Sequence, residues 1–471
     1  MGDGPDQLSS ADMSSLLDER GPIHVHVGGT ARFAGRPPRF GEFREHVRER
    51  LELIPRFRRR VRWLPGRILR AEWEDDPDFD LDRHVRHVAL PAPGGDAELR
   101  DLVGRVMSEP LDQSRPLWQI YLVERCGAGA ERGFAAISKT HHALVDGISA
   151  IDVGAVILDP DPGGTDLGLS GRDWRPRAQR RADEVLADRI LDARRLLLGI
   201  PREAARRALD PSTPQAALRT AQGFLDLARS TDPVPATIIN EEIGRDRRVA
   251  FAATTLAAMK AAAAAHGATV NDAVLAVSTG ALRRLFESRR VEIPDRFSAL
   301  VPMSIRKPGE ELELGNRITT LIVPLPLAEA DADERLRVIH ATTARLKESE
   351  AARAASLVIE ASGWVPPTVS RVLGSIGAAG RPVGRIVPQR LPWNLVVSNV
   401  PGPPMPVYLL GRRLEAINPF VPLSPQRRAL SIGVISYDGG LFFGLVGDRD
   451  RIADLDAFAG FVQSELAALT D

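Results

Sequence analysis

The stretch "FAAISKTHHALVDGIS", residues 134–149, sets a strand-like run directly before a helix-like one. The apolar residues of "FAAISKT" predict a strand, and "ISAIDVGAVIL", residues 148–158, predicts a buried helix with one apolar face. Two histidines, an aspartate and a glycine fill the turn between them. Because α/β folds commonly build sites at such strand ends, this turn is the first candidate for a functional site.

The composition limits the classes of protein to which the chain can belong. Its 471 residues are too many for one ordinary domain, so two or three domains are expected. Lys+Arg and Asp+Glu both number 62, and the resulting zero net charge argues against nucleic acid as the main partner. The single cysteine, Cys126, excludes an internal disulfide framework and any cysteine-rich metal site.

No segment of the sequence predicts insertion into a membrane. The opening "MGDGPDQLSS" has no basic region and no apolar core, so we expect no secretory signal. No apolar run approaches the about 18 residues that a transmembrane helix needs. We therefore expect a soluble, cytoplasmic protein that is at most peripheral to a membrane.

The order of helical and strand-like patterns predicts an α/β or α+β protein with two domains. Residues 1–170 and 241–471 both mix strands with helices, whereas residues 171–240 resemble an Arg-rich helical linker. The linker arginines are interpreted as a solvated helix face, with contact to an anionic membrane as the alternative. The predicted strands are 117–124, 134–140, 297–305, 317–325, 395–400, 430–438 and 441–448. The main predicted helices are 43–57, 99–107, 148–158 and 268–286.

Metal binding and helix capping are two interpretations of the histidine turn. His141 and His142 are adjacent, so a strand would point them to opposite faces, and one metal ion would rarely take both. His84 and His87 could share a helix face, but no cysteine or carboxylate cluster supports them as ligands. Asp146 precedes the predicted helix, so it could be an ordinary N-cap beside two core histidines. No metal site is predicted.

Proton transfer is the third interpretation. A neutral imidazole has a pKa near about 6.5, which suits general-base work at neutral pH. A nearby carboxylate such as Asp146 can fix the tautomer or brace the loop, and Gly147 permits close backbone approach or a positive φ. The chain contains no "GxSxG" nucleophile elbow, which favours one-step acyl transfer without an acyl-enzyme.

The stretch "HHALVDG" resembles the HHxxxDG motif of the CoA-dependent acyltransferase superfamily. Further stretches along the chain together resemble the bacterial wax ester synthase/diacylglycerol acyltransferase family, over essentially the whole length. They are "LSSADMSSLLDERGPIHVHVGG", "FDLDRHVRHVALPAPGG", "PLDQSRPLWQIYLVE", "TVNDAVLAVSTGALRRLF", "LVPMSIR", "GNRI" and "VVSNVPGPPMPVYLLGRRL". The "DFGWG" element of the related condensation domains is missing, which argues against that relative.

The resemblance implies two chloramphenicol-acetyltransferase-like domains, each a mixed sheet flanked by helices, with the histidine motif in a channel at their interface. It implies acyl-CoA as the donor and diacylglycerol or a fatty alcohol as the acceptor, with no further cofactor. Such substrates require peripheral contact with the inner face of the membrane or with lipid inclusions, and the Arg-rich linker is the candidate surface. The oligomeric state stays open.

The resemblance also assigns roles within the histidine turn. His142 resembles the catalytic base, and His141 resembles a supporting residue. Asp146 resembles the residue that braces the loop, with Arg306 of "VPMSIRKPG" as its candidate partner, and Gly147 is the joint of the turn. General acid–base assistance of this kind contributes about 10²–10⁴-fold to the rate.

Five further residues match family motifs and are predicted to contact substrate, each with a structural alternative. Asn271 is an oxyanion donor or substrate-holding group, or else an N-cap, and Asp272 beside it is the more structural of the pair. Trp118 of "PLW" lines the acyl channel or belongs to the core. Ser398 and Asn399 of "SNVPGP" face the channel, bridge the domains or form a turn.

Two other functions stay open on the sequence alone. The same fold could acylate another acceptor, such as a polyketide or glycolipid hydroxyl. The chain could also be a catalytically inactive relative that recruits partners, although the intact His142 and Asp146 argue against that alternative.

Overall fold

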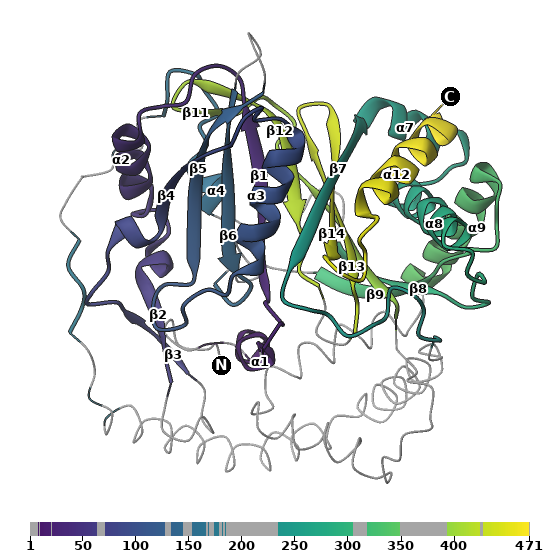
Figure 1. Cartoon of the computed structure of the whole chain (residues 1–471), viewed down its shortest axis with the longest axis horizontal. Helices are drawn as coiled ribbons and strands as arrows, with labels where there is room; N and C mark the ends of the chain where they lie inside the picture. Colours follow the sequence, from purple (N-terminus) through teal and green to yellow (C-terminus); the bar gives the residue numbers. More distant parts are fainter. Residues whose placement is uncertain are drawn as a thin grey trace, which may run out of the picture.

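Two mixed β-sheets lie side by side in the computed structural model of the chain, and helices flank both of them (Figure 1). This arrangement confirms the predicted two-domain fold of mixed sheets and helices. The structure describes residues 8, 10–19, 21–63, 71–127, 133–144, 153–165, 168, 174–178, 181, 184, 234–304, 318–348, 393–423 and 427–470.

The N-terminal sheet has six strands in the order β11-β12-β1-β6-β5-β4. Its strands are β1 (His26–Phe33), β4 (Val85–Ala89), β5 (Trp118–Cys126), β6 (Gly133–His141), β11 (Tyr408–Leu409) and β12 (Arg412–Phe420). β4 and β5 run parallel, while the other neighbours are antiparallel. Side chains of β6 are buried on both faces, as its unbroken apolar run predicts.

The helices α2 (Phe40–Arg50) and α3 (Asp96–Ser108) accompany this sheet. The predicted helix 99–107 is confirmed by α3. The helix predicted over 43–57 is wrong beyond α2, because Pro55 begins a short 3₁₀ turn, Pro55–Arg58, instead of continuing the helix.

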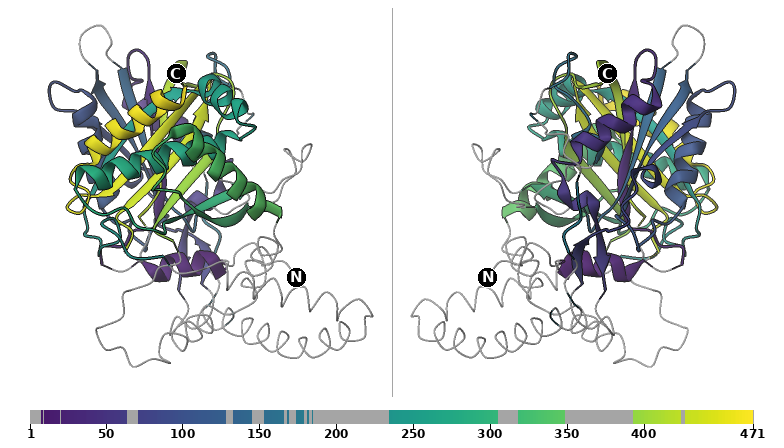
Figure 2. Two further views of the ribbon diagram at one scale, coloured as in Figure 1. Left: turned by 90° about the vertical axis from the view of Figure 1, so that its right-hand side faces the viewer. Right: turned by 90° about the vertical axis from the view of Figure 1, so that its left-hand side faces the viewer.

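The C-terminal sheet also has six strands, in the order β7-β14-β13-β10-β8-β9. Its strands are β7 (Arg247–Thr255), β8 (Ser298–Ser304), β9 (Ile318–Pro324), β10 (Leu395–Pro401), β13 (Leu430–Tyr437) and β14 (Gly440–Asp448). Its helices are α7 (Leu256–Ala265), α8 (Val270–Ser288), α9 (Ala332–Glu348) and α12 (Leu455–Thr470). Figure 2 shows these helices gathered over one face of the sheet. All predicted strands of this half and the predicted helix 268–286 are confirmed.

The strand β12 crosses between the two predicted domains, 1–170 and 241–471, whose bounds stay a prediction. Although it lies late in the chain, it pairs antiparallel with β1, from Gly28 opposite Phe420 onward. The end of β12 also passes over the C-terminal sheet, where an added Cβ on Gly444 would come within 1.8 Å of the Pro419 carbonyl oxygen. The N-terminal sheet is therefore completed by the C-terminal part of the chain.

A second connection joins α3 to β7. Gly104 of α3 packs so closely that an added Cβ would lie 2.7 Å from the Arg247 carbonyl oxygen. The Arg247 N–H donates to Ser108 Oγ over 2.7 Å, and its guanidinium donates to the Pro22 carbonyl over 2.6 Å. Both connections hold the two sheets in a fixed relation.

The remaining described elements are short. They are α1 (Ser10–Asp18), β2 (Arg59–Arg62), β3 (Glu72–Asp75), the 3₁₀ turn Leu81–Arg83 and α4 (Val153–Val156). Of the helix predicted at 148–158, only the part from residue 153 is described, and most of the predicted linker lies outside the described residues. No helix among the described residues is both long and apolar enough to cross a membrane.

Candidate active site

The histidine turn is held by the backbone of two neighbouring segments. His141 is the last residue of β6, and His142 begins the turn that follows. The His141 N–H donates to the Leu117 carbonyl and the His142 N–H to the Val25 carbonyl, each over 2.9 Å. The Leu144 N–H closes the turn by donating to the His141 carbonyl over 2.9 Å. The strand end therefore presents His142 from a backbone with fixed partners.

The His141 side chain is fully enclosed, with 0% of its surface exposed. Its Nδ1 accepts a hydrogen bond from the Ala143 N–H over 3.0 Å, and an accepting ring nitrogen carries no proton. The ring proton therefore sits on Nε2, which lies 3.3 Å from Oε1 of Glu19. That contact is aligned too poorly for a full hydrogen bond, so it is mainly an electrostatic attraction.

Glu19 is a site residue to which the sequence assigned no role. Its Oε1 accepts from the Val25 N–H over 2.8 Å, and its Oε2 accepts from the Gln113 side-chain amide over 3.0 Å. Burial acts to raise the pKa of Glu19, but the interaction with His141 and the two donors outweigh it and lower the pKa to about 2. The carboxylate is therefore ionised at neutral pH. Its only sequence signal was its place in the family-like opening segment.

The His142 imidazole is in a different environment, because its side chain is exposed. Desolvation nevertheless lowers its pKa below the ordinary 6.5, and the neighbouring His141 acts in the same direction. A hydrogen bond to its own backbone opposes these effects without cancelling them. The ring thus keeps an open surface while the surrounding protein disfavours its charged form, so it is neutral and able to accept a proton at pH 7.

Three residues predicted for this site lie outside the described part of the chain. They are Asp146, Gly147 and Arg306. The bracing role of Asp146, its pairing with Arg306 and the hinge role of Gly147 therefore stay predictions.

Asn271 lies in the first turn of α8, but it is not the N-cap. The cap is Thr269, whose Oγ1 accepts from the Asp272 N–H over 3.2 Å while the Asp272 carboxylate accepts from the Thr269 N–H over 2.9 Å. The N-cap alternative for Asn271 is therefore wrong. Its side-chain nitrogen is buried and has no hydrogen-bond partner in the described part of the chain, which leaves a donor for an oxygen of another molecule.

The surroundings of Asp272 favour a structural role over the predicted contact with substrate. Its side chain is 0% exposed, and its carboxylate accepts from Thr343 Oγ1 over 2.7 Å. His340 Nδ1 lies 3.0 Å away, and both of these partners belong to α9. Because protein groups occupy both of its oxygens, Asp272 joins the start of α8 to α9.

Trp118 belongs to the core of the N-terminal domain. Its side chain is 0% exposed, and its Nε1 donates to the Phe57 carbonyl over 2.7 Å. Its ring stacks on His84, with 4.7 Å between ring centroids. This position favours the core alternative and leaves no accessible surface for an acyl chain.

Ser398 and Asn399 lie inside β10, so the prediction of a turn there is wrong. Neighbouring residues of a strand point to opposite faces. Ser398 stands in register with Gly433, where an added Cβ would lie 2.8 Å from Val421 of the crossing segment. Asn399 stands in register with Val434, which is buried in the C-terminal core. Ser398 therefore lies on the face of the sheet that β12 crosses, which favours a domain-bridging position, whereas Asn399 lies on the opposite face.

The histidines suggested as an alternative metal pair do not share an environment. His84 Nδ1 lies 2.8 Å from the Trp118 carbonyl, whereas His87 pairs with Glu124 over 2.8 Å. Among the residues that the structure describes, no three His, Cys, Asp or Glu side chains are grouped to hold a metal ion. Burial raises the pKa of the Cys126 thiol to about 11, so it is a poor nucleophile.

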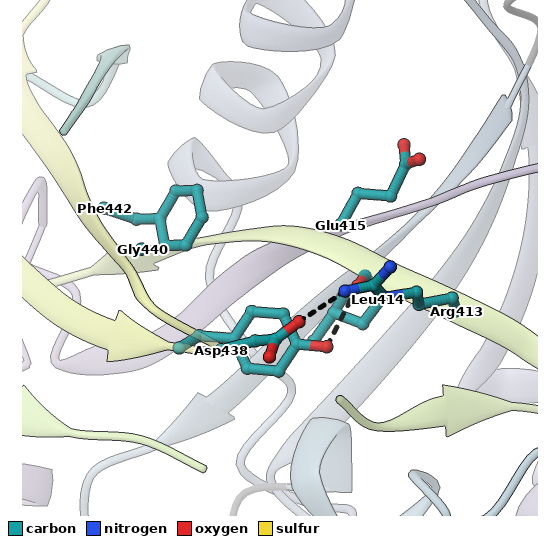
Figure 3. A pocket seen from close by; sticks show the side chains of 7 residues that line it. Arg413, Leu414, Glu415, Asp438, Gly440 and Phe442 are labelled. Atoms are coloured by element: carbon teal, nitrogen blue, oxygen red, sulfur yellow. Dashed lines mark hydrogen bonds and ion pairs between the residues drawn. The ribbon is translucent and has the colours of Figure 1, made fainter. Parts of the chain in front are cut away.

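A pocket of about 290 Å³ lies at the hairpin between β13 and β14 (Figure 3). It is lined by Arg413, Leu414, Glu415, Tyr437, Asp438, Gly440 and Phe442. Arg413 and Asp438 form an ion pair over 2.6 Å on its wall. Since no predicted site residue lines it, we do not assign acyl transfer to this pocket.

Comparison with known proteins finds relatives along the whole chain. A model of the wax ester synthase/diacylglycerol acyltransferase catalytic domain matches residues 8–274, and a model of the C-terminal domain of these proteins matches residues 314–470. A probable diacylglycerol O-acyltransferase of Mycobacterium tuberculosis is 34% identical over 475 residues, with 98% of both chains covered. Another protein of that organism with the same description is 29% identical, over 98% of this chain and 95% of its own.

Solved structures share the fold. The wax ester synthase/diacylglycerol acyltransferase from Marinobacter aquaeolei VT8 has 26% identity and a TM-score of 0.67, with 98% of both chains covered. The starter condensation domain of rhizomide synthetase has 14% identity and a TM-score of 0.55, over 98% of this chain and 94% of its own. The second likeness concerns the fold alone.

Proposed function

This chain belongs to the wax ester synthase/diacylglycerol acyltransferase family and is an acyltransferase, and from this premise we propose its substrates and its catalytic base. It moves a fatty acyl group from acyl-CoA to the hydroxyl of diacylglycerol, of a long-chain alcohol, or of both. The descriptions of its relatives support these acceptors. Acyl-CoA is a co-substrate, and the proposal includes no metal or cofactor.

The contrast between His141 and His142 carries the proposal. One ring is enclosed and held, whereas the next is exposed and neutral at pH 7. His142 accepts the proton of the acceptor hydroxyl while that oxygen attacks the thioester carbonyl. The C–S bond then breaks, and the imidazolium returns the proton to the sulfur of CoA. The products are the ester and free CoA.

Other predicted residues have supporting roles in this proposal. Asp146, paired with Arg306, braces the turn, and Gly147 shapes it. The side-chain nitrogen of Asn271, which has no hydrogen-bond partner among the described residues, donates to the developing oxyanion or holds the substrate. Loss of one such donor commonly lowers kcat about 10²–10³-fold.

The lipid acceptors imply a place of action. We propose peripheral, reversible contact with the inner face of the membrane or with lipid inclusions in the cytoplasm, through the Arg-rich segment 172–207. Replacing its arginines with glutamine is expected to weaken flotation with anionic liposomes and to leave flotation with zwitterionic liposomes unchanged. Unchanged flotation with anionic liposomes would show that another surface makes the contact.

The proposed reaction is tested by incubating purified protein with palmitoyl-CoA and either dioleoylglycerol or hexadecanol. Free CoA and the neutral-lipid product are both measured. We expect His142→Ala to abolish product formation. The control is His266→Ala, which removes an imidazole that pairs with Asp333 at the surface. An active His142→Ala protein would contradict the role of His142 as the base.

The acceptor that gives product in this assay distinguishes triacylglycerol synthesis, wax ester synthesis and the two alternative functions. Product from dioleoylglycerol alone indicates triacylglycerol synthesis, and product from hexadecanol alone indicates wax ester synthesis. CoA release only with another hydroxyl acceptor would move the assignment to that acceptor. No CoA release with any acceptor would indicate a non-catalytic relative.

A further inference from the structure

We infer that Glu19 and His141 act as a carboxylate–imidazole pair that positions the backbone of His142 and so aims the proposed base. Neither side chain reaches the reacting atoms, so both are positioning residues and not catalytic residues. The inference rests on the proposed role of His142 and deepens it by naming the groups that hold this residue in place.

Glu19 joins three segments that are far apart in the sequence. One carboxylate oxygen accepts from the Val25 N–H over 2.8 Å and lies 3.3 Å from His141 Nε2. The other oxygen accepts from the Gln113 amide over 3.0 Å. Only 7% of the Glu19 side chain is exposed, so water competes poorly for these contacts. The start of β1, the segment before β5 and the end of β6 therefore meet at one carboxylate.

The same contacts fix both peptide groups that flank the Cα atom of His142. On one side, the His142 N–H donates to the carbonyl of Val25, whose own N–H is held by Glu19. On the other side, the Ala143 N–H donates to Nδ1 of His141. Because φ and ψ are the only soft backbone angles at a residue, fixing both peptide planes fixes the direction of its Cα–Cβ bond. The direction in which the His142 ring leaves the backbone is thus set.

The negative charge of Glu19 selects the tautomer on which this arrangement depends. His141 can accept from the Ala143 N–H only while its proton is on Nε2, and Nε2 is the nitrogen that faces Glu19. The carboxylate attracts that proton and so disfavours the other tautomer. Without it, Nδ1 would be protonated part of the time and would repel the Ala143 N–H.

The inference is tested by steady-state kinetics of Glu19→Ala, Glu19→Gln and His141→Asn with palmitoyl-CoA and the preferred acceptor. We expect Glu19→Ala to lower kcat about 10- to 100-fold, since small misplacements of a reacting group have effects of that size. KM should change less than about twofold, because substrate binding is not the step that is lost. Glu19→Gln should recover only part of kcat, since its amide oxygen still accepts from the Val25 N–H but its lost charge no longer holds the His141 proton on Nε2.

Two further variants separate positioning from loss of fold. In Glu19→Ala/His141→Asn, kcat should be no lower than in the slower single variant, because both substitutions break one unit. The control is Glu465→Gln, which alters a buried carboxylate that pairs with Arg335 in the C-terminal domain. It should lower the melting temperature without lowering kcat. Additive losses in the double variant would overturn the inference.

A spectroscopic readout keeps the inference testable even if Glu19→Ala does not fold. In ¹⁵N-histidine-labelled protein, the signals of His141 are assigned by their absence in His141→Asn. We expect the proton of wild-type His141 on Nε2, and a mixture of tautomers in Glu19→Gln. A wild-type proton on Nδ1 would overturn the inference.

The results also distinguish this inference from the proposed function. If His142→Ala is inactive while a folded Glu19→Ala protein keeps the wild-type kcat, only the positioning role is wrong. If His142→Ala is active, the proposed role of His142 as the base is wrong, and the positioning role that rests on it is wrong as well.

Discussion

Replacing Gly444 with alanine tests how closely the end of β12 crosses the C-terminal sheet. An added Cβ would lie 1.8 Å from the Pro419 carbonyl oxygen and 2.8 Å from its carbonyl carbon. Both are backbone atoms, so no side-chain rotation relieves the overlap, and the crossing segment must move away from β14. That movement would also disturb the hydrogen bond from Asn418 Nδ2 to the Phe443 carbonyl, now 3.1 Å long.

We expect the substitution to lower the free energy of unfolding by about 3 kcal/mol, the upper end of the usual range for overpacking, because main chain must move. A change of 1 kcal/mol shifts the melting temperature of a large domain by about 2–4 °C, so the melting temperature should fall by about 6 °C or more. Differential scanning calorimetry measures the change.

Gly460→Ala is the matched control. Gly460 lies inside α12, where an added Cβ meets nothing within 4 Å, so alanine should stabilise the helix by up to about 1 kcal/mol. If Gly444→Ala melts at the wild-type temperature while Gly460→Ala behaves as expected, β12 does not cross the sheet as closely as described.

Three further predictions concern the N-terminal domain. Trp118→Phe removes the donor to the Phe57 carbonyl and should destabilise the protein by about 1–3 kcal/mol without changing kcat, as thermal melts and kinetics would show. The acid limb of the pH profile of kcat/KM should fall below pH 6.5, because desolvation lowers the pKa of His142; a midpoint above 6.5 would contradict this. The pKa of the Glu19 carboxyl group is about 2, against an ordinary value of 4.5. The ionised carboxylate therefore stabilises the fold fully above pH 4.5, and this stabilisation is lost as the pH falls toward 2. The melting temperatures of wild type and Glu19→Gln should converge over that pH range.

The sequence predicted the strands with continuous apolar runs, but not β12. "RRLEAINPF" alternates buried residues such as Leu414 and Ala416 with charged ones, which is a strand pattern of period 2. The pattern does not say which sheet the strand joins. β12 joins the N-terminal sheet because one edge of β1 pairs with β6 and the other edge is left for β12.

The same limit applies to the site. The split between His141 and His142 was predicted from their motif, because a motif is local in sequence. The capping box of Thr269 and Asp272 is also visible in "TVND", yet one of the two alternatives for Asn271 placed the cap there. Glu19 was missed because its partners Gln113 and His141 are distant in sequence, and no local pattern records a contact of that kind.

The pairing of β12 with β1 sets the order in which the protein can be completed on the ribosome. One edge of β1 can pair with β6 soon after residue 141 has been made, but the other edge stays open until residue 420 emerges. At about 5–20 residues per second, that interval lasts roughly 14 to 56 seconds. An open strand edge pairs readily with other chains, so the nascent protein is prone to aggregate through β1 during this interval. Slower emergence of the C-terminal segment from the ribosome should therefore raise the demand for chaperones. Slower emergence of the segment before β6 should raise it less.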